Sequence, residues 1–176
     1  MVNSCPGNLP ERIAVMAGTF DPFTIGHKSI VDRGLELFDR IVICVGVNAA
    51  KLAENPALAV SAETRADNIR RIFAGCPRVE VVSSAELTVD VARRFGARFL
   101  LRGVRSVRDF EYERDMADLN FRLASLESVF LVAPPEMACI SSSAVRDIAS
   151  HGADVWFYAL IRISPPKPFP ISSVYL

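Results

Sequence analysis

Two glycines, a threonine and a histidine early in the chain have the types and spacing of a phosphate-binding loop. They lie in the stretch 17–27, AGTFDPFTIGH. Gly18 permits a sharp turn close to a ligand, and Thr19 supplies a hydroxyl group. A helix that begins near Gly26 and His27 would present free N–H groups to a phosphate, and a protonated His27 would add positive charge. The alternative is a simple turn, with His27 as an ordinary residue at the start of a helix.

A second stretch, Arg102-Gly103-Val104-Arg105, places two arginines around a glycine. Arginine forks match phosphate oxygens bidentately, so this pattern indicates an anion site. The alternative is that the arginines pair with Asp109 or Glu113, which follow at the start of the longest helical segment. Acidic residues in a first helical turn are expected from the helix dipole alone, although Glu113 could instead accept a hydrogen bond from a ribose hydroxyl.

Three consecutive serines, Ser141 to Ser143, follow Ile140 and lead into another helical segment. One serine is enough to cap a helix, whereas three hydroxyls with open amides can also hold a chain of phosphates. A further cation, Lys51, follows the second apolar run of the sequence. A lone lysine in a loop is usually solvated, so Lys51 is either surface or part of the same anion site.

Five short runs rich in β-branched residues alternate with segments of helical spacing. Such runs are typical of strands buried on both faces of a parallel sheet. Strands are predicted at Ile13–Met16, Ile41–Val47, Val79–Val82, Phe99–Leu101 and Ser128–Val132. The longest helical segment carries an apolar stripe at Tyr112, Met116, Leu119 and Leu123.

This alternation predicts an α/β fold, a doubly wound, Rossmann-like, five-stranded parallel sheet with helices on both faces. Right-handed crossovers leave few topologies, and we favour the strand order 3-2-1-4-5. Ligands of such sheets bind at the carboxyl ends of the strands, beside the point where the order reverses. The loops after Met16 and after Leu101 would therefore face one site.

Composition restricts the class of protein further. The chain of 176 residues is 51% hydrophobic, with 20 basic and 20 acidic residues. Zero net charge gives no broad attraction to nucleic acid or an anionic membrane, and no apolar run approaches the ~20 residues of a membrane helix. The four cysteines form no C-x-x-C pair, so neither a zinc site nor a disulfide framework is predicted. We expect a soluble cytoplasmic protein with neither nucleic acid nor membrane as a partner.

Together these motifs resemble the bacterial phosphopantetheine adenylyltransferase family of the nucleotidyltransferase superfamily. The segments 18–22 and 24–27 are similar to the T/H-x-G-H signature of the superfamily. The segments 102–105 and 109–113 are similar to the family's R-G-x-R and D-F-E-Y-E stretch, and 140–143 to its I-S-S-S motif. The resemblance extends from about Ile13 to Val155.

The resemblance implies a reaction in which ATP and 4′-phosphopantetheine give dephospho-coenzyme A and pyrophosphate, with Mg²⁺. The pantetheine phosphate would attack the α-phosphorus in line, without a covalent enzyme intermediate. Such a reaction is catalysed mainly by positioning and by stabilising charge on the transferred group. The resemblance also implies a homohexamer and inhibition by coenzyme A.

Residue by residue, the resemblance implies that His27, Lys51 and Arg102 are catalytic, with His27 on the five-coordinate α-phosphate. Thr19, Lys51 and Arg102 would hold the substrate phosphate, and Thr88 would contact the pantetheine arm. The ATP site would comprise Thr19, Phe20, His27, Gly103, Val104, Arg105, Glu113, Met137, Ala138, Cys139, Ile140, Ser141, Ser142 and Ser143. No side chain is implied as a direct metal ligand.

Three segments depart from the family pattern. Residues 1–11 are predicted to be a flexible N-terminal extension before a nucleotidyltransferase domain of residues 12–155, and the segment 52–60 is longer than is usual after Lys51. Residues 156–176 form a divergent tail with prolines at 165, 166, 168 and 170, which exclude a regular helix there. The competing functions are nucleotidyl transfer to nicotinamide mononucleotide or to a sugar or glycerol phosphate, and nucleotide binding without catalysis.

Overall fold

Five parallel strands form a single sheet in the computed structural model, which describes residues 10–47 and 60–160. The strands are β1 (Ile13–Gly18), β2 (Arg40–Gly46), β3 (Val79–Ser84), β4 (Phe99–Val104) and β5 (Glu127–Val132). Their order is β3-β2-β1-β4-β5, and every neighbouring pair runs parallel. The predicted fold class and strand order are confirmed, although β1 and β4 continue beyond their predicted ends at Met16 and Leu101.

Alternation along the central strands builds two separate cores, one on each face of the sheet. In β1, Ala14 and Met16 belong to one core, while Ile13 and Val15 belong to the other. These side chains are almost completely buried, which explains why the strand has no polar positions. An apolar run without alternation is therefore the pattern of a strand that is covered on both faces.

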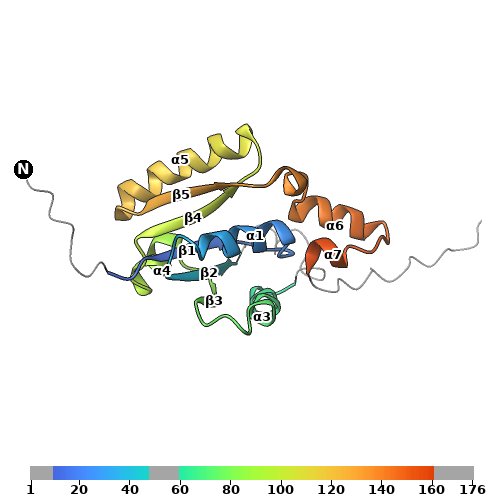
Figure 1. Cartoon of the computed structure of the whole chain (residues 1–176), viewed down its shortest axis with the longest axis horizontal. Helices are drawn as coiled ribbons and strands as arrows, with labels where there is room; N and C mark the ends of the chain where they lie inside the picture. The colour runs from blue at the N-terminus through green and yellow to red at the C-terminus, as the bar shows by residue number, and fades with distance from the viewer. Residues whose placement is uncertain (1–9, 48–59, 161–176) are drawn as a thin grey trace, which may run out of the picture.

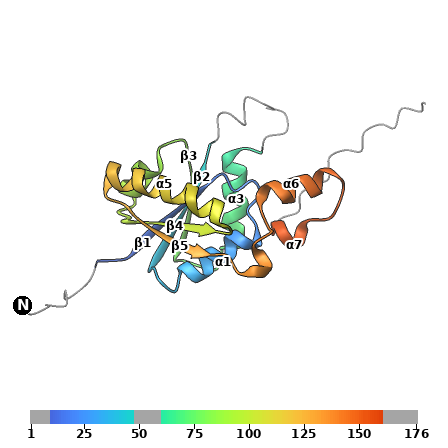
Figure 2. The same ribbon diagram turned by 90° about the horizontal axis from the view of Figure 1, so that it is seen from above.

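Six helices and one 3₁₀ turn connect and cover the strands in the described part of the chain. They are α1 (Ile25–Gly34), α3 (Ala62–Ile72), α4 (Thr88–Arg94), α5 (Val107–Ala124), η1 (Pro135–Met137), α6 (Ser142–Ser150) and α7 (Trp156–Ala159). α1 and α3 pack in the core that contains Ala14, whereas α4 packs in the core that contains Val15. α1 and α5 lie on opposite sides of β4 (Figure 2).

The two halves of the sheet separate at the point where the strand order reverses. β1 pairs with β4 only at Ala14 and Val15, opposite Phe99 and Leu100. By contrast, β1 stays paired with β2 as far as Gly18, and β4 stays paired with β5 as far as Val104. The carboxyl ends of β1 and β4 therefore diverge, and this divergence opens the space for a ligand.

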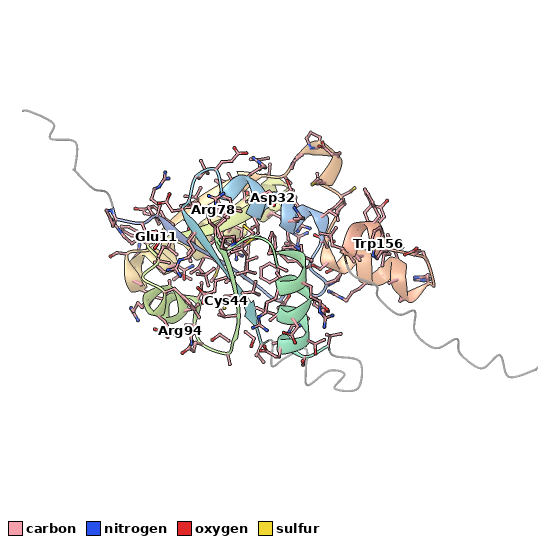
Figure 3. The ribbon with its side chains drawn as sticks, turned by 60° about the horizontal axis from the view of Figure 1, so that its bottom comes forward. Glu11, Asp32, Cys44, Arg78, Arg94 and Trp156 are labelled. Carbon is pink, nitrogen blue, oxygen red and sulfur yellow. The ribbon has the colours of Figure 1, made fainter. Side chains whose placement is uncertain are left out.

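α6 and α7 lie side by side at one end of the protein (Figure 1). Val155 and Ala159 are buried in a small cluster with Val145 and Ala149 of α6. The first residues of the predicted tail thus pack on the domain, while residues 161–176 lie outside the described part of the chain. Trp156 lies exposed at one end of the protein (Figure 3), and Arg78 and Arg94 are also exposed, whereas Cys44 is buried.

α5 confirms the predicted helix, but its apolar stripe does not face the sheet. Tyr112, Met116, Leu119 and Leu123 are between 37% and 64% exposed. Its half-buried residues are instead polar or small, namely Asp109, Glu113, Ala117, Asn120 and Ala124.

Among the described helices, none is long and apolar enough to cross a membrane.

Candidate active site

A cavity of about 270 Å³ lies at the diverging carboxyl ends of β1 and β4. Its volume is close to the lower end of the range for small-molecule sites, ~300–1,000 Å³. The loop after β1, the start of α1, the end of β4, α5 and the segment from η1 to α6 all contribute to its wall. Twelve predicted residues line it: Thr19, Phe20, His27, Arg102, Gly103, Arg105, Glu113, Met137, Ile140, Ser141, Ser142 and Ser143.

Five predicted site residues are not placed on this wall. Val104 is buried, and its carbonyl accepts a hydrogen bond from the Ala133 N–H. Ala138 and Cys139 are exposed, and Thr88 begins α4 beyond β3. The fifth, Lys51, lies outside the described residues. The roles assigned to these five residues stay predictions.

Thr24 determines the orientation and the tautomer of His27. Its hydroxyl caps α1 by accepting the His27 N–H, and its own N–H donates to His27 Nδ1 at 3.0 Å. A nitrogen that accepts a hydrogen bond cannot carry the proton of a neutral imidazole, so that proton lies on Nε2. Thr24 is only 1% exposed, which makes this contact rigid.

His27 is uncharged at neutral pH. The rings of Phe20 and Phe23 enclose it at centroid distances of 5.2 and 5.4 Å. Burial, reinforced by the positive charges of Arg105 and Arg102, lowers the pKa of His27 to about 4. His27 therefore offers the cavity a neutral Nε2–H donor rather than the positive charge considered from the sequence.

We expect an NMR titration of the ligand-free protein to give a His27 pKa of about 4, below the usual 6.5, with the proton of the neutral ring on Nε2. The unfolded chain takes up its proton first as the pH falls. At pH 7 this histidine therefore leaves the free energy of unfolding unchanged. The free energy of unfolding declines as the pH falls from 6.5 to 4, and the total loss is about 3 kcal/mol once both states are protonated. His27→Gln identifies the signal, since the chain has two histidines. An Nδ1–H tautomer would contradict the role given to Thr24.

The two arginines of the second motif pair with acids of α5. Arg102 Nε and Nη2 contact the two carboxylate oxygens of Glu113 at 2.6 and 2.5 Å, and its Nη1 donates to the Ala17 carbonyl at 2.5 Å. Arg105 Nε contacts Asp109 at 2.9 Å. The alternative of paired arginines is thus what the structure shows, and these contacts turn the polar side of α5 to the sheet.

Pairing does not remove the arginines from the site, because both still line the cavity. A guanidinium has five N–H groups, and the contacts of Arg102 use three of them. Two N–H groups remain for a phosphate. The two arginines and their two acids carry no net charge together, so the amides at the starts of α1 and α6 become the important complement to an anion.

The three serine hydroxyls already have partners within the protein. Ser141 Oγ accepts the Ala144 N–H at 3.0 Å and so caps α6. Ser142 Oγ donates to the Pro22 carbonyl at 2.9 Å, and Ser143 Oγ accepts from Arg146 at 3.3 Å. The capping alternative is confirmed for Ser141. Because Ser141 and Ser143 only accept in these contacts, their O–H groups stay available to a phosphate, together with the first-turn amides of α6.

Gly103 lines the cavity, and close packing against α1 also explains why this residue is a glycine. A Cβ on this residue would lie 2.9 Å from Ile30 Cγ1, well inside contact distance. Ile30 is a buried residue of α1. A side chain at 103 would therefore push α1, and with it His27, away from the sheet.

Two arginines that no sequence prediction included hold the first loop from outside the cavity. Arg65 of α3 donates to the Thr19 carbonyl, and Arg146 of α6 donates to the Asp21 carbonyl. Neither residue belongs to a local motif, and arginine is ordinary on the polar side of a helix. The sequence alone contains no signal that separates these two from other helical arginines.

Comparison with known proteins agrees with this geometry. Residues 15–148 match the family model described as Cytidylyltransferase-like. The solved bifunctional NMN adenylyltransferase/ADP ribose pyrophosphatase of Francisella tularensis, complexed with AMP and a Mn ion, superposes with a TM-score of 0.60 at 15% identity, over 88% of this chain and 46% of that chain. A putative nicotinate-nucleotide adenylyltransferase of Vibrio parahaemolyticus gives 0.59 at 15% identity, over 85% of this chain and 87% of that chain. The fold is that of a nucleotidyltransferase.

Two curated relatives define the family more narrowly. The phosphopantetheine adenylyltransferase of Porphyromonas gingivalis is 45% identical over 147 residues, which cover 84% of this chain and 93% of the relative. That of Bacteroides thetaiotaomicron is 42% identical over 144 residues, or 82% and 92% of the two chains. The chain belongs to the phosphopantetheine adenylyltransferase family, which confirms the resemblance inferred from the motifs.

Proposed function

We propose that this protein transfers the adenylyl group of ATP to 4′-phosphopantetheine, with dephospho-coenzyme A and pyrophosphate as products. Its family membership supports an adenylyltransferase of coenzyme A biosynthesis. One observation supports this cavity as the site of the reaction: three motifs that are distant in sequence, represented by His27, Arg102 and Ser142, line the same cavity.

In the proposed mechanism, an oxygen of the pantetheine phosphate attacks the α-phosphorus of ATP while pyrophosphate leaves from the opposite side. The protein supplies hydrogen-bond donors that are in place before the reaction. His27 Nε2–H and the first amides of α1 would stabilise the α-phosphate oxygens. The free N–H groups of Arg102 would hold the acceptor phosphate, while Arg105 and the amides at the start of α6 would hold the nucleotide.

A divalent cation fits this site if the triphosphate holds most of its coordination shell. No group of three or more histidine, cysteine or acidic side chains gathers among the residues the structure describes. Mg²⁺ in nucleotide enzymes commonly binds through substrate phosphates and water, with one or two carboxylates at most. When bound there, Mg²⁺ would neutralise charge on the departing pyrophosphate.

Release of pyrophosphate from ATP and Mg²⁺ with a series of acceptors tests the function directly. We expect rapid release with 4′-phosphopantetheine and none above background with nicotinamide mononucleotide or glycerol phosphate. Preference for another acceptor would identify a different nucleotidyltransferase. Binding of ATP without turnover of any acceptor would identify a nucleotide-binding protein without catalysis.

We also propose that the exposed stripe of α5 is covered by another subunit in a homo-oligomer. The stripe consists of Tyr112, Met116, Leu119 and Leu123, four large side chains on one side of a helix. Large exposed apolar patches on a soluble protein commonly mark interfaces. The resemblance to the family implies a hexamer, and this face is one of the apolar surfaces that the monomer leaves uncovered among the described residues.

We expect Leu119→Glu to shift the protein from the oligomer towards the monomer, because a buried charge in an apolar interface is costly. Sedimentation velocity compares the mass of each variant with that of the 19.3 kDa subunit. Leu37→Glu is the matched control, since Leu37 is 43% exposed and lies outside α5. An unchanged oligomer in Leu119→Glu, or a monomeric wild-type protein, would exclude this face as the interface.

A further inference from the structure

Arg65 holds the carboxyl ends of β1 and β2 in an unusual way for a charged residue. Its guanidinium donates to three main-chain carbonyls, those of Thr19, Gly46 at 3.3 Å and Val60 at 3.2 Å. No carboxylate lies within 4.0 Å of it among the described residues, although it is half-buried. A half-buried guanidinium that only binds carbonyls is oriented by the backbone, and it orients the backbone in return.

The carbonyl that Arg65 holds belongs to a peptide in a rare conformation. Phe20 has a φ of +46°, in the left-handed region that bulky residues seldom occupy. This dihedral angle determines how the Thr19–Phe20 peptide is rotated about the N–Cα bond of Phe20. On one side the Phe20 ring is buried against Phe23 and His27, and on the other side Arg65 holds the Thr19 carbonyl. Both ends of the strained angle are therefore restrained.

The direction of this peptide determines where its N–H points. In a trans peptide the N–H lies opposite the carbonyl. The Thr19 carbonyl faces Arg65, which is not part of the cavity wall, whereas Thr19 and Phe20 both line the cavity. The Phe20 N–H therefore points away from Arg65, and it donates to no backbone carbonyl of the described residues.

We propose that Arg65 is a positioning residue for the adenylyl transfer proposed above, on which this inference rests. By holding the Thr19–Phe20 peptide, it presents the Phe20 N–H to a phosphate oxygen of the bound nucleotide. Without Arg65 the peptide turns, φ relaxes towards negative values and the donor is lost. A donor that is fixed before the reaction stabilises developing charge without reorganisation during the reaction.

Arg65→Met keeps the length of the side chain and removes all its donors. We expect kcat to fall by about 10²-fold, the loss typical of one transition-state donor, with the KM for phosphopantetheine changed less than about threefold. Arg71→Met is the matched control, because Arg71 is exposed on the same helix and the charge change is identical. Arg65→Lys retains one donor to the Thr19 carbonyl, so its kcat should lie between those of wild type and Arg65→Met.

A crystal structure of Arg65→Met provides a readout that does not depend on activity. We expect a turned Thr19 carbonyl and a negative φ at Phe20, whereas Arg71→Met should retain the original peptide. Should Arg65→Met fail to fold, Arg65→Lys carries both measurements. A folded variant with near-normal kcat, or with the Phe20 angle unchanged, would overturn the inference. Absence of turnover in the wild type would instead refute the proposed function. The crystal structures of Arg65→Met and Arg71→Met would then still decide whether Arg65 holds the Thr19–Phe20 peptide.

Discussion

Replacing His27 with alanine should lower kcat by about 10²–10³-fold, the cost of removing one transition-state donor in a preorganised site. The dissociation constant for ATP should change far less, because the neutral Nε2–H matters most when charge develops on the α-phosphate. Thr24 and the two phenylalanine rings hold this donor in a single orientation before any substrate binds. The loss should therefore appear in kcat rather than in KM.

Single-turnover kinetics and calorimetric ATP binding separate these two effects. His151→Ala is the matched control, since it removes the only other histidine, which is exposed on the C-terminal side of α6. We expect the control to keep normal turnover. Turnover of His27→Ala within a few-fold of wild type would remove His27 from the mechanism.

The second large effect should separate the two arginines. Arg102→Ala should weaken phosphopantetheine binding by about 30–100-fold, which corresponds to the ~2–3 kcal/mol of a charge-assisted contact. Its effect on ATP should be several-fold smaller. Arg105→Ala should show the reverse preference, because Arg105 begins the segment that leads away from the end of β4.

Glu113→Gln tests whether pairing prepares Arg102 for its substrate. Glu113 holds Arg102 by two hydrogen bonds, and the pair is less than a third exposed. A glutamine can accept only one of these bonds, so Arg102 gains freedom and phosphopantetheine should bind more weakly than in wild type. Isothermal calorimetry with each substrate distinguishes the variants. Equal losses for both substrates in Arg102→Ala and Arg105→Ala would refute the assignment.

The two arginine–acid pairs carry no net charge, and this affects how an anion enters the site. An arriving phosphate meets two guanidinium groups that are already compensated by Glu113 and Asp109. It can use the free N–H groups of each arginine without breaking either pair. Binding then depends less on net charge and more on the direction of the donors, which favours a ligand whose phosphates match several donors at once.

Local patterns in the sequence were sufficient for the architecture and for the family. Apolar runs such as Val42–Val45, alternating with helical segments, predicted the parallel sheet because strands buried on both faces need no polar positions. The reversal of strand order then predicted that Thr19 and Arg102 would meet, although 83 residues separate them in number (102 − 19). Both predictions depend on short-range periodicity and on general rules of chain topology, so they needed no knowledge of individual contacts.

Only the tertiary structure decided the charge state of the site. The pKa of His27 depends on its burial and on the nearby charges of Arg105 and Arg102, whereas its tautomer follows from a local contact, the capping box that Thr24 makes with His27 three positions later. The apolar stripe of α5 faces outward because Arg102 and Arg105 anchor the opposite side of the helix through Glu113 and Asp109. Arg65 reaches Thr19 across 46 positions of sequence without belonging to any motif. Burial and long-range pairing are properties of the folded chain, and no local pattern of residues specifies them.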